Sequence, residues 1–195
     1  MPETKSTGAS ACTKSQNMKC SQCKTTSYSF ALVACAMALA TSSARAGDNR
    51  APEVPAAIEV PEGNKVHFHV YAEGVQIYSW NGSSWVFQAP EALLFADAGG
   101  NGTVGIHYAG PTWESASGSK VVGARLASAP SPNANSIPLL LLRARTAEGP
   151  GIFARTTYIQ RVNTVGGVAP STPGSAVGEQ ARVPYTAEYF FYRGK

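Results

Sequence analysis

Three histidines are the side chains of this chain with the clearest potential for metal chemistry. His67 and His69 stand two residues apart in a stretch of alternating polar and apolar residues, and His107 lies in a second such stretch. On a strand, residues i and i+2 project from the same face about 7 Å apart. Two such histidines and a third from a neighbouring strand are one way to ligate zinc or copper. The three histidines therefore form a candidate metal site.

The same alternation supports a simpler interpretation, which we favour. The apolar residues of this stretch would all face the core: Val66, Phe68, Val70 and Ala72. His67, His69 and Tyr71 would then lie on the solvated face of an ordinary strand. On this interpretation the chain needs no cofactor.

A second candidate site surrounds the Gly110-Pro111 turn. His107 precedes this turn and Glu114 follows it, and a histidine beside a carboxylate can act as a general acid and base. Tyr108 and Trp113 could instead hold a polar ligand there. The interpretation we favour is a packed corner in which Trp113 covers the core, so a fully buried Trp113 would weaken the proposed site.

Two short motifs match enzyme signatures without the context that such chemistry requires. Residues 100–105 fit G-x-G-x-x-G, but a dinucleotide site needs a helix directly after the glycines, and a Gly-Pro turn follows instead. Residues 117–120 fit S-x-x-K, but they lie in a Gly-Ser turn before a predicted strand rather than at a helix start. We therefore expect neither NAD binding nor acyl-enzyme chemistry.

Aromatic and basic residues gather in two further regions. Stacking on a glycan or packing in the core would each explain the aromatic cluster, which comprises Tyr71, Tyr78, Trp80 and Trp85. An anion-binding stripe or scattered surface ion pairs would each explain the basic cluster, which comprises Arg143, Arg145, Arg155 and Arg161. For both clusters we favour the structural explanation.

Residues 1–46 are predicted to be an export signal. A basic region with Lys19 and Lys24 precedes an apolar stretch at residues 28–40, and Ala44-Arg45-Ala46 supplies small residues for cleavage. The polar start favours Met18 as the true initiation site. We expect a secreted or periplasmic protein with no transmembrane segment; the alternative is a lipoprotein anchored through Cys35, which ends a lipobox-like sequence.

This segment also accounts for the charge and the cysteines. The chain has 16 basic and 12 acidic residues, but five of the basic and one of the acidic residues precede residue 47, which leaves residues 47–195 formally neutral. All four cysteines, including the C-x-x-C pair Cys20 and Cys23, lie in the same segment. A neutral domain is not expected to bind nucleic acid, and residues 47–195 can form no disulfide.

Short β-rich runs separated by Gly, Pro, Ser and Asn occupy residues 65–195, after an extended lead-in at residues 47–64. Residues 66–72, 75–80 and 85–88 are predicted to form a meander, with turns at Glu73-Gly74 and Asn81-Gly82. Residues 139–142 are four leucines, which suit a strand buried on both faces or a short buried helix. The pattern predicts a single all-β domain, an antiparallel β-sandwich or β-barrel.

Several blocks along residues 65–195 resemble a known family. They are residues 74–78, 110–114, 118–123, 159–170 and 183–190. In order and in content they are similar to the signature blocks of a secreted domain-of-unknown-function family of bacteria and fungi. Some fungal members carry the label malate dehydrogenase, which the glycine motif discussed above does not support. The resemblance implies a secreted domain and no particular activity.

Two hypotheses for function follow from the sequence. The first is a non-catalytic module that binds a small molecule, a glycan or a surface partner. The alternative is a secreted hydrolytic enzyme, metal-dependent or acid/base, centred on His107. The sequence indicates neither the ligand nor an oligomeric state.

Overall fold

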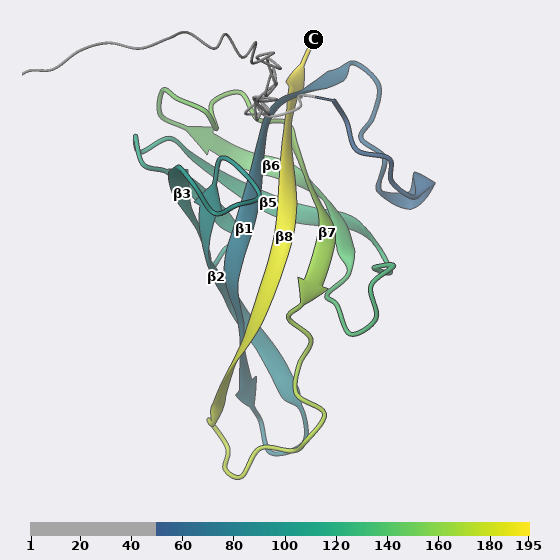
Figure 1. Ribbon diagram of the computed structural model, residues 1–195, viewed down its shortest axis with the longest axis vertical. Coiled ribbons are helices and arrows are strands. Elements are labelled where there is room, and N and C mark those ends of the chain that lie inside the picture. Colours follow the sequence, from purple (N-terminus) through teal and green to yellow (C-terminus); the bar gives the residue numbers. More distant parts are fainter. Residues whose placement is uncertain (1–49) are drawn as a thin grey trace, which may run out of the picture. The chain divides into compact units, whose positions relative to one another are not determined.

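The computed structural model describes residues 50–195, which form one closed antiparallel β-barrel (Figure 1). Eight strands follow one another around the ring in chain order, and β8 pairs with β1 to close it. The strands are β1 (Asn64–Trp80), β2 (Trp85–Phe95), β3 (Thr103–Tyr108), β4 (Thr112–Ser115), β5 (Lys120–Ala129), β6 (Leu139–Glu148), β7 (Tyr158–Gly166) and β8 (Gln180–Gly194). The all-β prediction is confirmed, and of its two architectures the chain adopts the barrel.

The Glu73-Gly74 pair is not the turn that the sequence predicted. β1 runs through Gly74 without a break, and β2 likewise continues from the run predicted at residues 85–88 to Phe95. A Cβ on Gly74 would lie 2.1 Å from the carbonyl oxygen of Glu91 on β2, so this position requires glycine for the close approach of two backbones. Gly74 therefore allows β1 to pair with β2 at a position where the sequence had predicted a turn.

A β-bulge near the start of β1 changes which side chains face inward. The pairing with β8 shifts between Val66 and Phe68, which leaves His67 as the extra residue. Phe68 packs with the inner core, whereas Val66 packs in a cluster outside the barrel with Phe190 of β8. The prediction that Val66 and Phe68 share the core face was wrong, because a strict period of two cannot anticipate a bulge.

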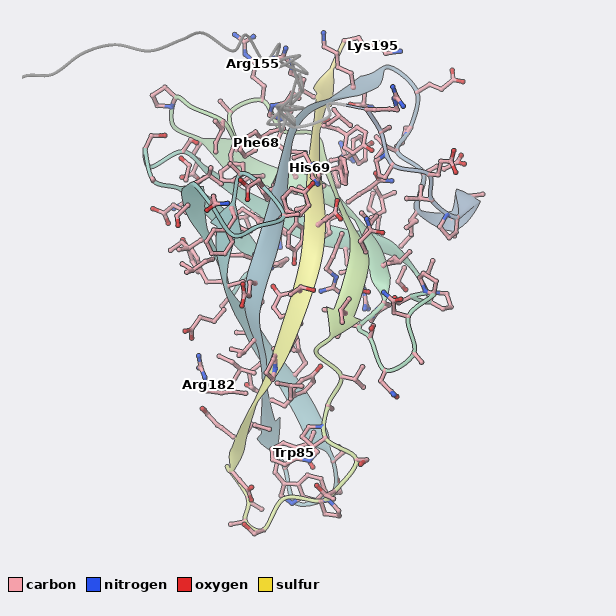
Figure 2. The ribbon with its side chains drawn as sticks, in the orientation of Figure 1. Phe68, His69, Trp85, Arg155, Arg182 and Lys195 are labelled. Carbon is pink, nitrogen blue, oxygen red and sulfur yellow. The ribbon has the colours of Figure 1, made fainter. Side chains whose placement is uncertain are left out.

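An aromatic plug closes one end of the barrel. Phe153, in the connection between β6 and β7, is fully buried, and its ring centroid lies 6.0 Å from that of Phe68 and 4.7 Å from that of Phe191. Its amide N–H donates a hydrogen bond of 3.2 Å to the Oγ of Ser119 in the β4–β5 turn. Figure 2 shows Phe68 in the half of the barrel that holds Lys195, and Trp85 at the opposite tip.

A second apolar layer lies outside the barrel, where residues 50–63 cover the strands. This segment contains a short 3-10 helix, η1 (Ala56–Ile58), whose Ile58 is fully buried against Leu139 and Leu141. The side-chain amide of Gln160 on β7 donates a hydrogen bond of 2.7 Å to the carbonyl oxygen of Ile58. The run of four leucines is therefore a strand buried on both faces, one of the two alternatives that the sequence allowed.

The far tip of the β1–β2 hairpin is held by aromatic packing. Trp80 and Trp85 are cross-strand partners with ring centroids 5.5 Å apart, and the Nε1–H of Trp85 donates to the carbonyl oxygen of Thr172 at 2.9 Å. The connection between β7 and β8 is thereby fixed to the hairpin. Over residues 50–195, no helix has the length and apolar character needed to cross a membrane.

Candidate functional site: a cavity inside the barrel

A cavity of about 490 Å³ opens inside the barrel at the end opposite the Phe153 plug. Its floor consists of buried side chains, and its rim of exposed ones. The floor is formed by Gln76, Tyr78, His107, Trp113, Leu142, Arg161 and Tyr189. The rim includes Phe87, Gln88, Gly110, Arg125 and Pro138. A volume in this range, with apolar walls and a few polar groups, is typical of small-molecule sites.

Two nitrogen atoms at the floor have no hydrogen-bond partner. They are Nε2 of Gln76, a residue that is 2% exposed, and Nε1 of Trp113, a residue that is 1% exposed. The Gln76 amide lies near the Tyr185 hydroxyl. Burial raises the pKa of Tyr185, and the Gln76 amide lowers it by a smaller amount. Even so, Nε2 of Gln76 makes no hydrogen bond of acceptable geometry. A buried donor without a partner costs about 1–3 kcal/mol, and both side chains belong to the cavity lining.

Arg161 of β7 brings a positive charge to the same floor. It is 9% exposed, and its Nε and Nη2 donate hydrogen bonds of 3.2 and 2.9 Å to the carbonyl oxygen of Pro138. Burial raises the pKa of Tyr189, and the nearby Arg161 guanidinium partly offsets this effect. Among the described residues, no carboxylate forms an ion pair with Arg161. A buried charge normally has such a partner.

His107 is part of the cavity wall and is uncharged. It pairs in register with Trp113, and the two rings stack with centroids 4.3 Å apart and an interplanar angle of 11°. Its Nδ1–H donates a hydrogen bond of 2.8 Å to the carbonyl oxygen of Thr112, so Nε2 is left as an acceptor. Burial, together with the charge of Arg161, lowers the pKa of His107 to about 3.

The fold separates the predicted acid and base. Glu114 pairs with Ile106 in the register of β3 and β4, whereas Trp113 pairs with His107, so alternation places Glu114 and His107 on opposite faces of the sheet. On the outer face, the Tyr108 hydroxyl donates a hydrogen bond of 2.7 Å to Oε2 of Glu114. Of the four residues predicted around the Gly-Pro turn, only His107 and Trp113 reach the cavity. Trp113 is buried, which weakens the predicted loop site.

The three histidines also lie apart. His69 stacks on Phe190 outside the barrel and contacts Oε2 of Glu188 at 2.8 Å, whereas His107 faces inward. His67 contacts Oγ1 of Thr156 at 3.3 Å. Within residues 50–195, no group of three or more His, Cys, Asp or Glu side chains is arranged to hold a metal ion.

The aromatic cluster and the basic cluster identified in the sequence are each split in the structure. One member of each lines the cavity, and the others do not. Trp80 and Trp85 pair with each other at the hairpin tip, as the packing interpretation expected, whereas Tyr78 enters the cavity floor. Arg143, Arg145 and Arg155 are exposed on or beside β6, and Arg161 alone of the four points into the barrel. The arginines therefore do not form one stripe.

Sequence reasoning did not identify Gln76 or Arg125 as site residues. The signal for Gln76 was available, because it stands two residues from Gly74 and from Tyr78 in an alternating run. A polar residue at an inward position of a strand indicates either a hydrogen-bond partner inside the core or a ligand. Arg125 offered no comparable signal, since its strand is interrupted by a bulge beside it.

The barrel and its cavity define a small antiparallel β-barrel protein with an internal site open at one end. Within that class, the chain belongs to DUF3455, a protein family of unknown function, whose model matches residues 61–193. This match confirms the resemblance to a domain-of-unknown-function family. Neither the curated proteins nor the solved structures contain a significant match to this chain.

Proposed function

We propose that this protein is a non-catalytic binding module that holds one small molecule in the barrel cavity. The observation that carries the proposal is the cavity floor, where two unpaired N–H donors and an arginine without an acidic partner are buried together. Eight-stranded barrels have an interior just wide enough either to be filled by side chains or to hold one small ligand. Here side chains fill one end, and the other end remains hollow.

The composition of the cavity wall favours binding over catalysis. No Asp, Glu, Cys or Ser lines this cavity in the described structure, so His107 has no carboxylate partner and no nucleophile beside it. The ring of His107 is held by Trp113 and Thr112. Its lowered pKa keeps it neutral near pH 7, and it is suited to accept one hydrogen bond from a ligand.

The export signal predicted in residues 1–46 lies outside the described residues, and it supports placing this binding activity outside the cytoplasm. A barrel without disulfides depends on its two apolar layers for stability in that environment. The predicted cleavage after Ala46 would leave residues 50–63, which form the outer layer, attached to the barrel.

A substitution that fills the cavity tests the proposal. Leu140 lines the cavity on β6, and Leu140→Trp should occupy the space that a ligand needs. The matched control is Leu126→Trp, because Leu126 on β5 is 56% exposed and does not line the cavity. A library of small metabolites is screened by thermal unfolding, since a ligand that binds only the folded state raises the melting temperature.

We expect some compounds to raise the melting temperature of the wild type and of Leu126→Trp, but not that of Leu140→Trp. If no compound stabilises the wild type, the proposal fails. It also fails if the same compounds stabilise all three proteins equally, because the binding site would then lie outside the cavity.

A further inference from the structure

The charges that line the cavity are all of one sign. Two arginines, Arg161 at the floor and Arg125 at the rim, line it, and no acidic residue of the described structure does. The remaining charged surface of the domain is more balanced, with ion pairs between Lys120 and Glu148 and between Arg182 and Glu91. The cavity is therefore a locally basic site in a domain whose sequence is formally neutral.

The donors of the floor converge on one side chain, Tyr189. Arg161 is its direct partner in the β7–β8 ladder. The rings of Trp113 and His107 lie 5.3 and 5.1 Å from the Tyr189 ring, each edge to face. The hydroxyl groups of Tyr185 and Tyr189 are 3.5 Å apart. Side chains that carry N–H and O–H groups therefore lie around Tyr189, together with His107, whose free ring nitrogen is an acceptor.

Arg125 is placed differently. It is exposed on β5, it forms no hydrogen bond or ion pair with another described residue, and the strand pairing shifts directly after it. In the ladders, Arg125 pairs with Leu142, and Leu140 pairs with Arg161. Two leucines of β6 therefore lie between the two arginine-bearing strands, and they form an apolar wall between the floor charge and the rim charge.

From this arrangement we infer that the ligand is a small organic acid whose carboxylate meets Arg161 at the floor and whose apolar body lies along Leu140 and Leu142. This inference rests on the proposed function and names its ligand class. A carboxylate is an acceptor only, so it matches a floor that presents N–H donors from Gln76, Trp113 and Arg161. A neutral amide carries no charge for Arg161 and brings two N–H groups, for which the free ring nitrogen of His107 offers one acceptor.

Matched acids and amides test the charge requirement directly. Each of a set of aryl- and alkyl-carboxylic acids is titrated beside its own primary amide, which has nearly the same shape. Dissociation constants are measured by calorimetry on the wild type, Leu140→Trp, Arg161→Gln, Arg125→Gln and Arg143→Gln. Glutamine at 161 retains a donor for the Pro138 carbonyl oxygen, and Arg143, which is exposed on β6, is the matched surface control.

We expect acids to bind the wild type about tenfold or more tightly than their amides, because hydrogen bonds to charged groups are the stronger ones. Arg161→Gln should remove most of this preference, Arg125→Gln should weaken acid binding about fivefold or less, and Arg143→Gln should change nothing. If Arg161→Gln does not fold, the acid–amide comparison on the wild type still decides the question.

Two results would overturn the inference, and they separate it from the proposed function. If amides bind the wild type as tightly as acids and Leu140→Trp blocks both, the cavity binds ligands but does not select acids. If acids bind equally well to Leu140→Trp, the binding occurs outside the cavity, and the proposed function fails as well.

Discussion

Residues 106–108 illustrate that the type of a single residue does not predict whether its side chain faces the cavity. Ile106 is 44% exposed on the outer face of β3, whereas His107 is 3% exposed inside the barrel. Local alternation would place the apolar side chain inward and the histidine outward. The order is reversed here because the hollow end of the barrel has polar groups on its inner surface. The sequence could therefore identify His107 and Trp113 as candidate site residues, but it could not show which face of the sheet they occupy.

The buried neutral histidine predicts a specific dependence of stability on pH. The pKa of His107 is lowered to about 3 by burial and by Arg161, and that of His67 to about 4 by burial and by Arg193. An unfolded chain protonates both near pH 6.5. Between that pH and the folded values, the unfolded state binds more protons, so stability is lost as the pH falls and is unaffected above this window.

The variant His107→Gln tests this assignment. Urea unfolding between pH 7 and pH 4 should show a steep loss of stability for the wild type, on the order of a few kcal/mol by pH 4, and a shallower loss for His107→Gln. The comparison variant is His67→Gln, which should remove a similar share of the loss down to about pH 5 and a smaller share below it, because the folded-state pKa of His67 is about 4 and that of His107 about 3. Equal slopes for the wild type and His107→Gln would show that His107 is protonated in the folded state.

At the scale of elements, the sequence located the β-rich runs but not their boundaries. The alternating runs and the leucine run lie in strands, and Asn81-Gly82 lies in the turn between β1 and β2. The continuity of β1 through Gly74 depends on the backbone of β2, and no local rule contains that information. The shifts in register near His67 and after Ile77 have the same origin, because a bulge is fixed by both strands of a pair.

Gly74→Ala should be strongly destabilising for the same reason. The added Cβ would lie 2.1 Å from the Glu91 carbonyl oxygen, and that oxygen belongs to the ladder and cannot move freely. A cost of about 1–3 kcal/mol or more is expected, as for other overpacked sites, and urea unfolding would measure it. The control is Gly194→Ala, where a Cβ would meet no atom within 4 Å. Similar unfolding midpoints for the two variants would contradict the close-approach role.

At the scale of the whole molecule, the barrel has two unlike ends. One is filled by rings around Phe153, and the other is the cavity with its buried donors. The floor draws side chains from β1, β3, β4, β6, β7 and β8, which are spread over more than half of the chain. No spacing in the sequence could assemble them, because closure of the sheet brings them together. The sequence predicted the fold class, whereas the cavity follows from the closed topology.

Because the filled end and the hollow end of the barrel are separate, we expect that stability and ligand binding can be altered independently. Phe153→Ala should lower the free energy of unfolding by about 3–5 kcal/mol, as for other buried Phe→Ala changes, while the melting-temperature increase produced by cavity ligands is retained. The exposed Leu93, at 47%, provides the control, because Leu93→Ala should cost no more than about 0.5 kcal/mol. Loss of ligand binding in a folded Phe153→Ala protein would show that the two ends are coupled.

The ladder between β1 and β8 also sets the order in which this barrel can form. Every other ladder joins strands that are neighbours in the chain, so those pairs can arise as hairpins with short connections. The β1–β8 ladder joins Asn64 to Gly194, so most of the domain lies in the loop that it closes. Because the entropy cost of closing a loop rises with its length and non-local pairing slows folding, we expect the β1–β8 ladder to form late. The cavity floor, which takes side chains from both strands, should then be completed only near the end of folding.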